Sequence, residues 1–265
     1  EHPYSWPTIG LEPGHIARVT VEDAQRWFYS HYAPNNAILA IAGNVDFDTA
    51  CRRAEEWFAD VPSREIAQRR QPDPGFPAQA VTETVRGDVP YPLITIGIPM
   101  TEYGRPEYFA ADTITDILSV GRSGRLRNNL VNGPARGLIA EADASIIGSE
   151  GPGLLLLTFS VLSDTDADIE RAIELTWREV RRMGRPGDVS DRELQRTLNN
   201  FESTFRFSNI NYLSKATNLA QAELHGEDLN RTVSDRRALT PADIERESRR
   251  LFEDTPPVTL IYRPR

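Results

Sequence analysis

Thr-Val-Glu-Asp at residues 20–23 begins the stretch that decides the fold. A threonine followed three residues later by an acidic residue is typical of a helix N-cap, because each side chain can satisfy a free backbone N–H there. An amphipathic segment follows, and the breaker Tyr-Ala-Pro-Asn-Asn at 32–36 ends it. The apolar run after the breaker is typical of a short strand. The sequence therefore predicts a helix over about 21–32 and a strand over 37–43.

The same four features return, in the same order, at the end of the chain. Thr-Pro-Ala-Asp at 240–243 starts the second amphipathic segment, Thr-Pro-Pro at 255–257 breaks it, and Val-Thr-Leu-Ile-Tyr at 258–262 is the apolar run. In each copy 18 positions separate the threonine from Ile38 or Val258, and the copies lie 220 residues apart. This repeat predicts a duplicated domain. Because the first copy comes almost at once, we expect its domain to be truncated at the N-terminus and the chain to be a fragment.

Composition sets the broad class. The chain has 265 residues, of which 39% are apolar and 26% charged, as in globular domains. The net charge of -9 argues against a nucleic-acid-binding surface, which needs a basic face. The single cysteine, Cys51, rules out an intrachain disulfide, and no apolar run is long enough to span a membrane. The compartment stays open between periplasm and cytoplasm.

The order of the expected elements predicts an α+β fold. Residues 63–79 are rich in proline, glycine and charge and form the best linker, so we expect domains at 1–62 and 80–265. The second domain has strands first, then several helices, then a closing strand, which favours helices packed against one face of a mainly antiparallel sheet. Strands are expected at 80–86, 93–98, 138–147 and 153–162, and helices at 48–60, 106–119, 166–183, 190–205 and 211–224.

No residues have the spacing of a metal site. None of the four histidines has a second histidine or a glutamate placed on one helical face, and neither HExxH nor HxxEH occurs. We therefore expect no zinc ligands in this chain. The histidines are His2, His15, His31 and His225.

The glycine-rich segment 121–126, Gly-Arg-Ser-Gly-Arg-Leu, could suggest a phosphate-binding loop. It lacks both established phosphate-loop patterns and follows a predicted helix rather than a strand. A helix C-cap turn explains it better.

Several stretches in combination resemble the pitrilysin/insulinase family of zinc metallopeptidases, which includes mitochondrial processing peptidase and bacterial relatives. The segments that carry the resemblance span nearly the whole chain, which is identified as a bacterial, processing-peptidase-like member. They are His2-Pro3-Tyr4 with Pro7, Ile9 and Gly10; Thr20 with Asp23; Tyr32, Pro34 and Asn36; Ile41 to Asp46; and Ile117-Leu118 with Gly121 to Leu126, where Gly124 replaces the family's second serine.

The resemblance implies where zinc would bind. In the family, HxxEH lies on the first long helix of the first domain, and a further glutamate ligand precedes the His-Pro-Tyr stretch. All of these would lie upstream of Glu1. The corresponding helix of the second domain, 106–119, has no histidine. We therefore expect zinc in the intact parent protein, none in this chain, and a metal-free, inactive second domain.

The resemblance also suggests where substrate could be contacted. Catalytic relatives often use an arginine and a tyrosine of the second domain to stabilise charge on the substrate carbonyl. The matching strand here, 154–159, has neither residue type, and Arg206 and Tyr212 are the nearest candidates for substrate binding. The alternative is that Arg206 is solvated and Tyr212 packed in the core.

The sequence thus predicts the non-catalytic portion of a zinc-dependent endopeptidase, which closes a peptide-binding chamber. Its expected partners are the missing half-domain, of roughly 150 residues, or a partner subunit, and a peptide substrate; a dimer is possible. The alternative is a non-catalytic scaffold or peptide-binding subunit. A third hypothesis, an unrelated α+β binding domain, requires the repeat to be accidental.

Overall fold

The computed structural model describes residues 7, 9–68, 73, 75–148 and 151–265. The His-Pro-Tyr stretch at 2–4 lies outside the described residues. The chain forms two compact units: residues 1–75 with 206–229, and residues 76–205 with 230–265.

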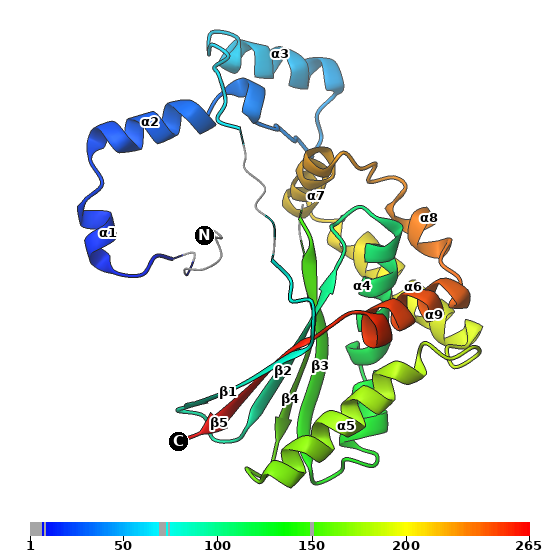
Figure 1. The fold of residues 1–265 in the computed structure, drawn as a ribbon. Helices are drawn as coiled ribbons and strands as arrows, with labels where there is room; N and C mark the ends of the chain where they lie inside the picture. Colours follow the sequence, from blue (N-terminus) through cyan, green and yellow to red (C-terminus); the bar gives the residue numbers. More distant parts are fainter. Residues whose placement is uncertain (1–6, 8, 69–72, 74, 149–150) are drawn as a thin grey trace. The chain divides into compact units, whose positions relative to one another are not determined.

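The second unit contains a five-stranded sheet (Figure 1). The strand order is β1-β5-β2-β4-β3, and all neighbours are antiparallel except β1 and β5, which are parallel. The predicted mainly antiparallel sheet is therefore confirmed. Its strands are β1 (Val81–Gly87), β2 (Leu93–Met100), β3 (Ile139–Ile147), β4 (Gly153–Val161) and β5 (Val258–Pro264).

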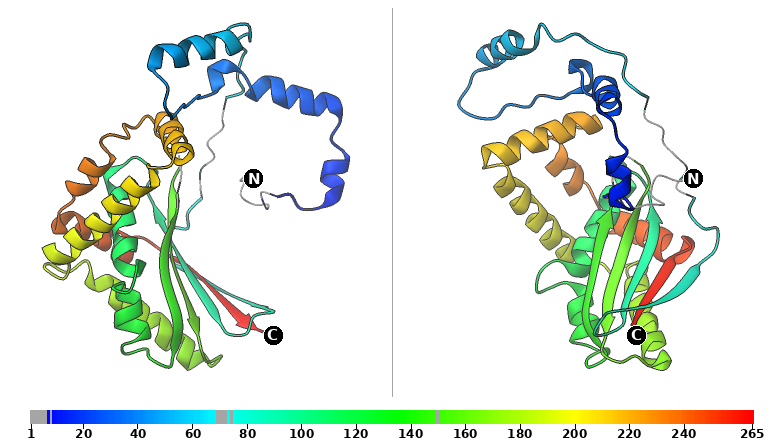
Figure 2. Two further views of the ribbon diagram at one scale, coloured as in Figure 1. Left: turned by 180° about the vertical axis from the view of Figure 1, so that it is seen from behind. Right: turned by 90° about the vertical axis from the view of Figure 1, so that its left-hand side faces the viewer.

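Helices cover one face of this sheet, as predicted for an α+β fold (Figures 1 and 2). Two short π-helices complete the layer. The elements are α4 (Pro106–Ser119), the π-helix η3 (Leu126–Val131), α5 (Asp166–Arg182), α6 (Asp191–Ser208), α8 (Thr232–Arg237), α9 (Pro241–Arg249) and the π-helix η4 (Arg250–Asp254). The last residues of α6, from Arg206 on, group with the first unit.

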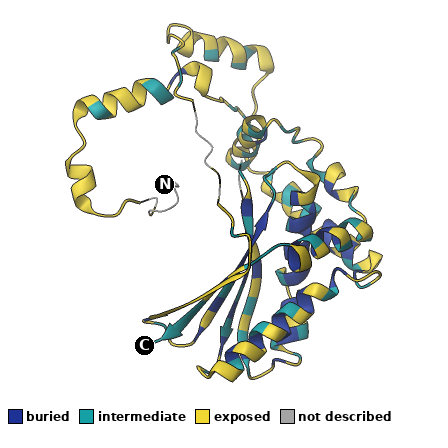
Figure 3. Ribbon diagram, viewed as in Figure 1, coloured by how far each residue is buried: buried dark blue, intermediate teal, exposed yellow. Residues whose placement is uncertain are grey.

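The core lies between the sheet and the helices (Figure 3). On β4, every second residue is fully buried: Leu155, Leu157 and Phe159 each expose 1% of their surface or less. This alternation is the strand period of two, and it directs these side chains toward the helices. Ile114 of α4 and Leu175 of α5 are equally buried on the helical side.

Helix α4 begins and ends where the sequence predicts. Pro106 starts it, and Gly121, two residues beyond its end, has the left-handed φ of +70° that favours glycine. The glycine-rich segment therefore starts as a turn after α4, as predicted, but its last residues, Arg125 and Leu126, begin the π-helix η3. A Cβ on Gly124 would lie 2.9 Å from the backbone of Leu118 and Ser119. The loop therefore passes against the end of α4 too closely for a side chain at position 124.

The first unit contains the first copy of the repeat. Thr20 caps α2 (Val21–His31) in a capping box: Asp23 N–H donates to Thr20 Oγ1, and Thr20 N–H donates to the Asp23 carboxylate, both at 3.2 Å. The amide of Asn36 donates to the carbonyl of His31 and so helps to end the helix. The unit's other elements are α1 (Pro13–Ala17), the 3-10 turn η2 (Pro34–Asn36), α3 (Phe47–Phe58) and α7 (Tyr212–His225).

The prediction of a strand over 37–43 is wrong. No strand forms there among the described residues, although the segment is apolar and Ala37 has extended angles. A strand requires hydrogen bonds from a neighbouring strand. In the second copy, β5 obtains them from both β1 and β2. The described part of the first unit contains no strand to which 37–43 could pair.

The second copy has the same cap and forms all of its elements. Thr240 and Asp243 make a capping box at the start of α9, with backbone-to-side-chain distances of 2.9 and 3.3 Å. α9 continues into η4 before β5 begins. The sequence predicts neither of the π-helices nor the short helices α1 and α8.

Candidate functional site

The sheet face opposite the helices is the candidate functional surface, and it is called the open face below. No helix of the second unit covers it in the described part of the chain (Figure 2). The alternation that buries Leu155 and Leu157 turns the residues between them to this side, where they are half-buried. On the three central strands, the open face consists of Leu93, Thr95, Gly97 and Pro99 of β2, Leu154, Leu156, Thr158 and Ser160 of β4, and Val258, Leu260 and Tyr262 of β5.

The centre of the open face is apolar around Gly97. Gly97 pairs with Leu156 on one side and Val258 on the other. A Cβ on Gly97 would meet Leu156 at 3.6 Å and Leu154 at 3.9 Å, so both leucines lean over this glycine. Leu260 is 40% exposed beside them. The result is an apolar strip across three strands.

Carboxylates flank this strip on both edge strands. Glu83 of β1 pairs with Leu260, and on β3 Glu141 and Asp143 pair with Ser160 and Thr158. Paired residues project to the same side of a sheet. The same pairing places the exposed Val81, Val85 and Ile147 on this side. The open face therefore combines an apolar centre with edges that contain both carboxylates and apolar side chains.

Tyr262 shapes the β1 side of the open face. A Cβ on Gly87 would lie only 1.9 Å from the hydroxyl oxygen of Tyr262, too close for the two atoms to coexist. Only a residue without a side chain leaves room for this ring. The glycine at the end of β1 thus lets the tyrosine lie flat across the neighbouring strand.

The two predicted substrate-binding residues lie on either side of the turn between α6 and α7. Arg206 is in the last turn of α6, and Tyr212 is the first residue of α7, capped by Asn211, whose side chain accepts from Leu213 N–H at 2.9 Å. Both side chains are exposed, Tyr212 by 63%. They belong to the first unit. Tyr212 is therefore not packed in the core, and a role in substrate binding stays a prediction.

The described residues contain no group of three or more histidine, cysteine, aspartate or glutamate side chains that could hold a metal ion. His31 stacks on Trp27, with 3.8 Å between ring centroids, and its Nδ1 lies 2.8 Å from Ser30 Oγ. Cys51 is exposed. In the part of the chain that the structure describes, no helix is long and apolar enough to cross a membrane.

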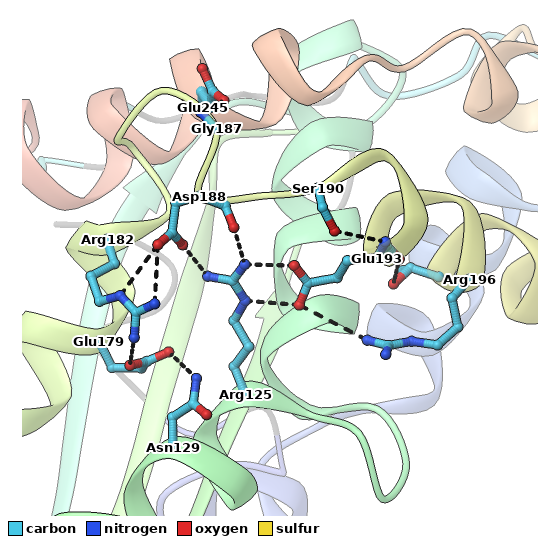
Figure 4. A network of polar contacts seen from close by, with 11 residues as sticks. Arg125, Asn129, Glu179, Arg182, Gly187, Asp188, Ser190, Glu193, Arg196 and Glu245 are labelled. Atoms are coloured by element: carbon cyan, nitrogen blue, oxygen red, sulfur yellow. Dashed lines mark hydrogen bonds and ion pairs between the residues drawn. The ribbon is translucent and has the colours of Figure 1, made fainter.

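Arg125, in the glycine-rich segment, is at the centre of a buried ion network (Figure 4). It donates to both oxygens of Glu193, at 2.9 and 2.6 Å, and also pairs with Asp188. Arg182 joins Asp188 to Glu179. Burial alone would lower the pKa of Arg125, but hydrogen bonds with Glu193 and Asp188 outweigh it and raise the pKa. This network joins η3 to the end of α5, to the loop that contains Asp188 and to the first turn of α6. Sequence reasoning missed this structural role.

A model of the family described as peptidase M16 inactive domain matches residues 18–201, well over half of the chain. The chain belongs to this family. The match confirms the resemblance to zinc metallopeptidases of the pitrilysin/insulinase type. The segment 18–201 includes the first copy of the repeat, the sheet strands β1 to β4 and helix α4.

Individual relatives match this chain over nearly its full length. It is 23% identical to zinc protease PqqE of Helicobacter pylori over 275 residues, covering 99% of this chain and 59% of that protein. A solved protease structure from Helicobacter pylori matches with a TM-score of 0.79 and 20% identity, over 99% of this chain and 63% of that one. A solved M16 inactive domain from Pseudomonas fluorescens matches with a TM-score of 0.79 and 16% identity, over 100% and 62%.

At these identities the solved structures show the fold alone. They confirm the α+β architecture for the chain. The present chain spans 59% to 63% of the length of these relatives.

Proposed function

We propose that this chain is the non-catalytic portion of a zinc-dependent endopeptidase, and that its open face forms one wall of the chamber that holds the peptide. Membership of the M16 inactive domain family supports this proposal. The observation that carries it is the open face itself, because a sheet in a globular protein normally buries an apolar surface such as Leu154, Leu156 and Leu260.

In this proposal the catalytic metal is held elsewhere in the intact protein. The name of the relative, zinc protease PqqE, supports zinc as the cofactor of the parent protein. The zinc ligands would precede residue 1, in the half-domain that residues 1–62 would complete; 63–79 would be the linker and 80–265 the inactive domain. The apolar segment 37–43 would then gain a partner strand from that half-domain. A partner subunit could supply the same strand.

The chemistry of the open face favours one kind of peptide. Apolar side chains would lie on the strip at Gly97, and basic side chains would be attracted to Glu83, Glu141 and Asp143. A separate proposal concerns the first unit: Arg206 and Tyr212 would contact a substrate carbonyl and stabilise charge that develops on its oxygen.

Two measurements on the purified chain test this function. Fluorescence anisotropy would measure binding of a labelled, unstructured peptide that contains apolar and basic residues. We expect Leu156→Lys and Leu260→Lys each to weaken binding by about tenfold or more, because a lysine places charge on the apolar strip. Gln195→Lys, at an exposed position of α6, adds the same single positive charge away from the open face and should leave the affinity unchanged. Folded Leu156→Lys and Leu260→Lys variants with wild-type affinity would contradict the proposal.

The second measurement is peptide hydrolysis by the same chain, with and without a chelator. We expect no hydrolysis in either case. Hydrolysis that a chelator abolishes would contradict the assignment of this chain as the non-catalytic portion.

The alternative function is a non-catalytic scaffold or peptide-binding subunit, which the open face favours equally. The sequence that precedes residue 1 in the parent protein distinguishes the two. HxxEH with a later glutamate supports the peptidase, and a parent without these residues supports the scaffold.

A further inference from the structure

A small pocket lies beside the end of α4, on the helical side of the sheet. Its volume is about 160 Å³. Asp116 of α4, Ser123 of the glycine-rich segment, and Arg196 and Asn200 of α6 line it. All four residues belong to the second unit, so their positions are fixed relative to one another. The pocket is separate from the open face, because α4 and α6 cover the opposite side of the sheet.

Asp116 is half-buried at the base of this pocket, and Ser123, Arg196 and Asn200 are exposed around it. Thr197 also lines the pocket, but its hydroxyl donates to the carbonyl of Glu193 at 3.1 Å. In the described part of the chain, the carboxylate of Asp116, the hydroxyl of Ser123 and the amide of Asn200 make no side-chain hydrogen bond. Arg196 has one ion pair there, a long one of 3.9 Å to Glu193. That carboxylate is already bound at 2.6 Å by Arg125. The guanidinium of Arg196 is therefore available for another anion.

Asp116 is half-buried, so its carboxylate has lost part of its hydration, and a bound cation would offset that loss. Burial raises the pKa of Asp116 to about 6, so the group is still mostly charged at neutral pH. Asp116 and Arg196 carry opposite charges and line the same small pocket, yet they do not form an ion pair with each other. A ligand that carries a cation and an anion would satisfy both groups.

We propose that this pocket binds a small α-amino acid. Its ammonium group would bind the carboxylate of Asp116, and its carboxylate would bind the guanidinium of Arg196. Ser123 and Asn200 would supply neutral hydrogen bonds to the same two groups. The volume suits an amino acid with a small side chain. A divalent cation fits less well, because one carboxylate beside a guanidinium is a poor set of oxygen ligands.

Isothermal titration calorimetry on the purified chain at pH 7.5 tests this proposal with L-alanine as the probe. We expect saturable binding at one site. L-Alaninamide lacks the carboxylate and N-acetyl-L-alanine lacks the ammonium group, so each should bind at least about tenfold more weakly. These comparisons use the wild-type chain and do not depend on a variant's folding.

Two variants test whether Asp116 binds the ammonium group of L-alanine and Arg196 its carboxylate. Asp116→Asn and Arg196→Gln should each weaken L-alanine binding by about tenfold or more. Arg192→Gln, at an exposed position of α6 outside the pocket, should bind as the wild type does. The absence of saturable binding would overturn the proposal. It would also fail if L-alaninamide bound as tightly as L-alanine, or if folded Asp116→Asn kept full affinity.

Discussion

Arg236 lies in the helical layer with 6% of its surface exposed. Its guanidinium donates to Thr113 Oγ1 at 3.1 Å, pairs with Asp112 and lies 4.3 Å from the ring centroid of Phe201. Burial lowers the pKa of Arg236 to about 10, so it stays charged at neutral pH. The sequence cannot single out this arginine, because its partners lie on other helices and arginine is frequent throughout the chain.

Replacing Arg236 with lysine should destabilise the second unit by about 2 kcal/mol. Lysine cannot keep the contacts with Thr113 and Asp112 while lying flat on Phe201. Urea unfolding followed by circular dichroism measures the change. Arg237→Lys is the matched control: Arg237 is exposed and donates to Glu202 and Asn199, and a lysine can keep the ion pair, so we expect a smaller change, of about 1 kcal/mol or less.

Arg125 should be the most sensitive residue of the ion network. Its replacement by alanine leaves Asp188 and Glu193 without their main partner, and we expect a loss of about 3 to 5 kcal/mol in unfolding free energy. Arg182 has 43% of its side chain exposed, so Arg182→Ala should cost about 1 kcal/mol. Equal losses for the two variants in urea unfolding would contradict the central position of Arg125.

Asp116 should make stability depend on pH. Burial raises the pKa of Asp116 to about 6 in the folded chain, whereas in the unfolded chain the carboxyl has its ordinary pKa of 3.8. At pH values between 3.8 and about 6, folding is therefore accompanied by uptake of a proton. The contribution of Asp116 to stability falls as the pH rises through this range. The charged groups facing it include Arg196 on α6, with Glu193 beside that arginine.

Asp116→Asn removes this titration. It should raise the unfolding free energy by about 1 kcal/mol at pH 7.5, where the wild type has a charged carboxylate, and have little effect at pH 4. Urea unfolding at both pH values measures the difference. A variant with the same effect at both would rule out the raised pKa as the cause.

At the scale of elements, the two capping boxes make the repeat a physical feature as well as a sequence pattern. Thr240→Ala should cost about 1 kcal/mol, because it leaves the backbone N–H of Asp243 without an acceptor at the start of α9. Thr240→Ser keeps the oxygen and should stay within about 0.5 kcal/mol of the wild type. Thermal unfolding followed by circular dichroism compares them, and an alanine variant as stable as the serine variant would contradict the role of the cap.

The helices could be predicted because their caps and periodicity are local signals. α4 is predicted over the same residues that the structure assigns, 106–119. Strands depend on partners far away in sequence, so 37–43 and 258–262 look alike but only the second is paired within the described residues. The parallel pairing of β1 with β5 joins residues more than 170 positions apart and has no local signal.

At the scale of the whole molecule, the sequence predicts the family but not the candidate surface. The run Leu154 to Leu157 is uniformly apolar, as in strands buried on both faces. Only the sheet register shows that Leu155 and Leu157 face the helices while Leu154 and Leu156 lie on the open face. The pocket at Asp116 is likewise not predictable from local sequence, because residues of α4 and α6 come together there only in the folded chain.

The most direct test of the open face as a peptide-binding wall is methyl NMR of the leucines during titration with an unstructured peptide. Neighbouring leucines of β4 project to opposite faces, so each strand contains its own control. The proposal predicts that the methyl resonances of Leu154, Leu156 and Leu260 shift in a saturable way while those of Leu155 and Leu157 move little. Saturable binding without shifts at Leu154, Leu156 and Leu260 would contradict it.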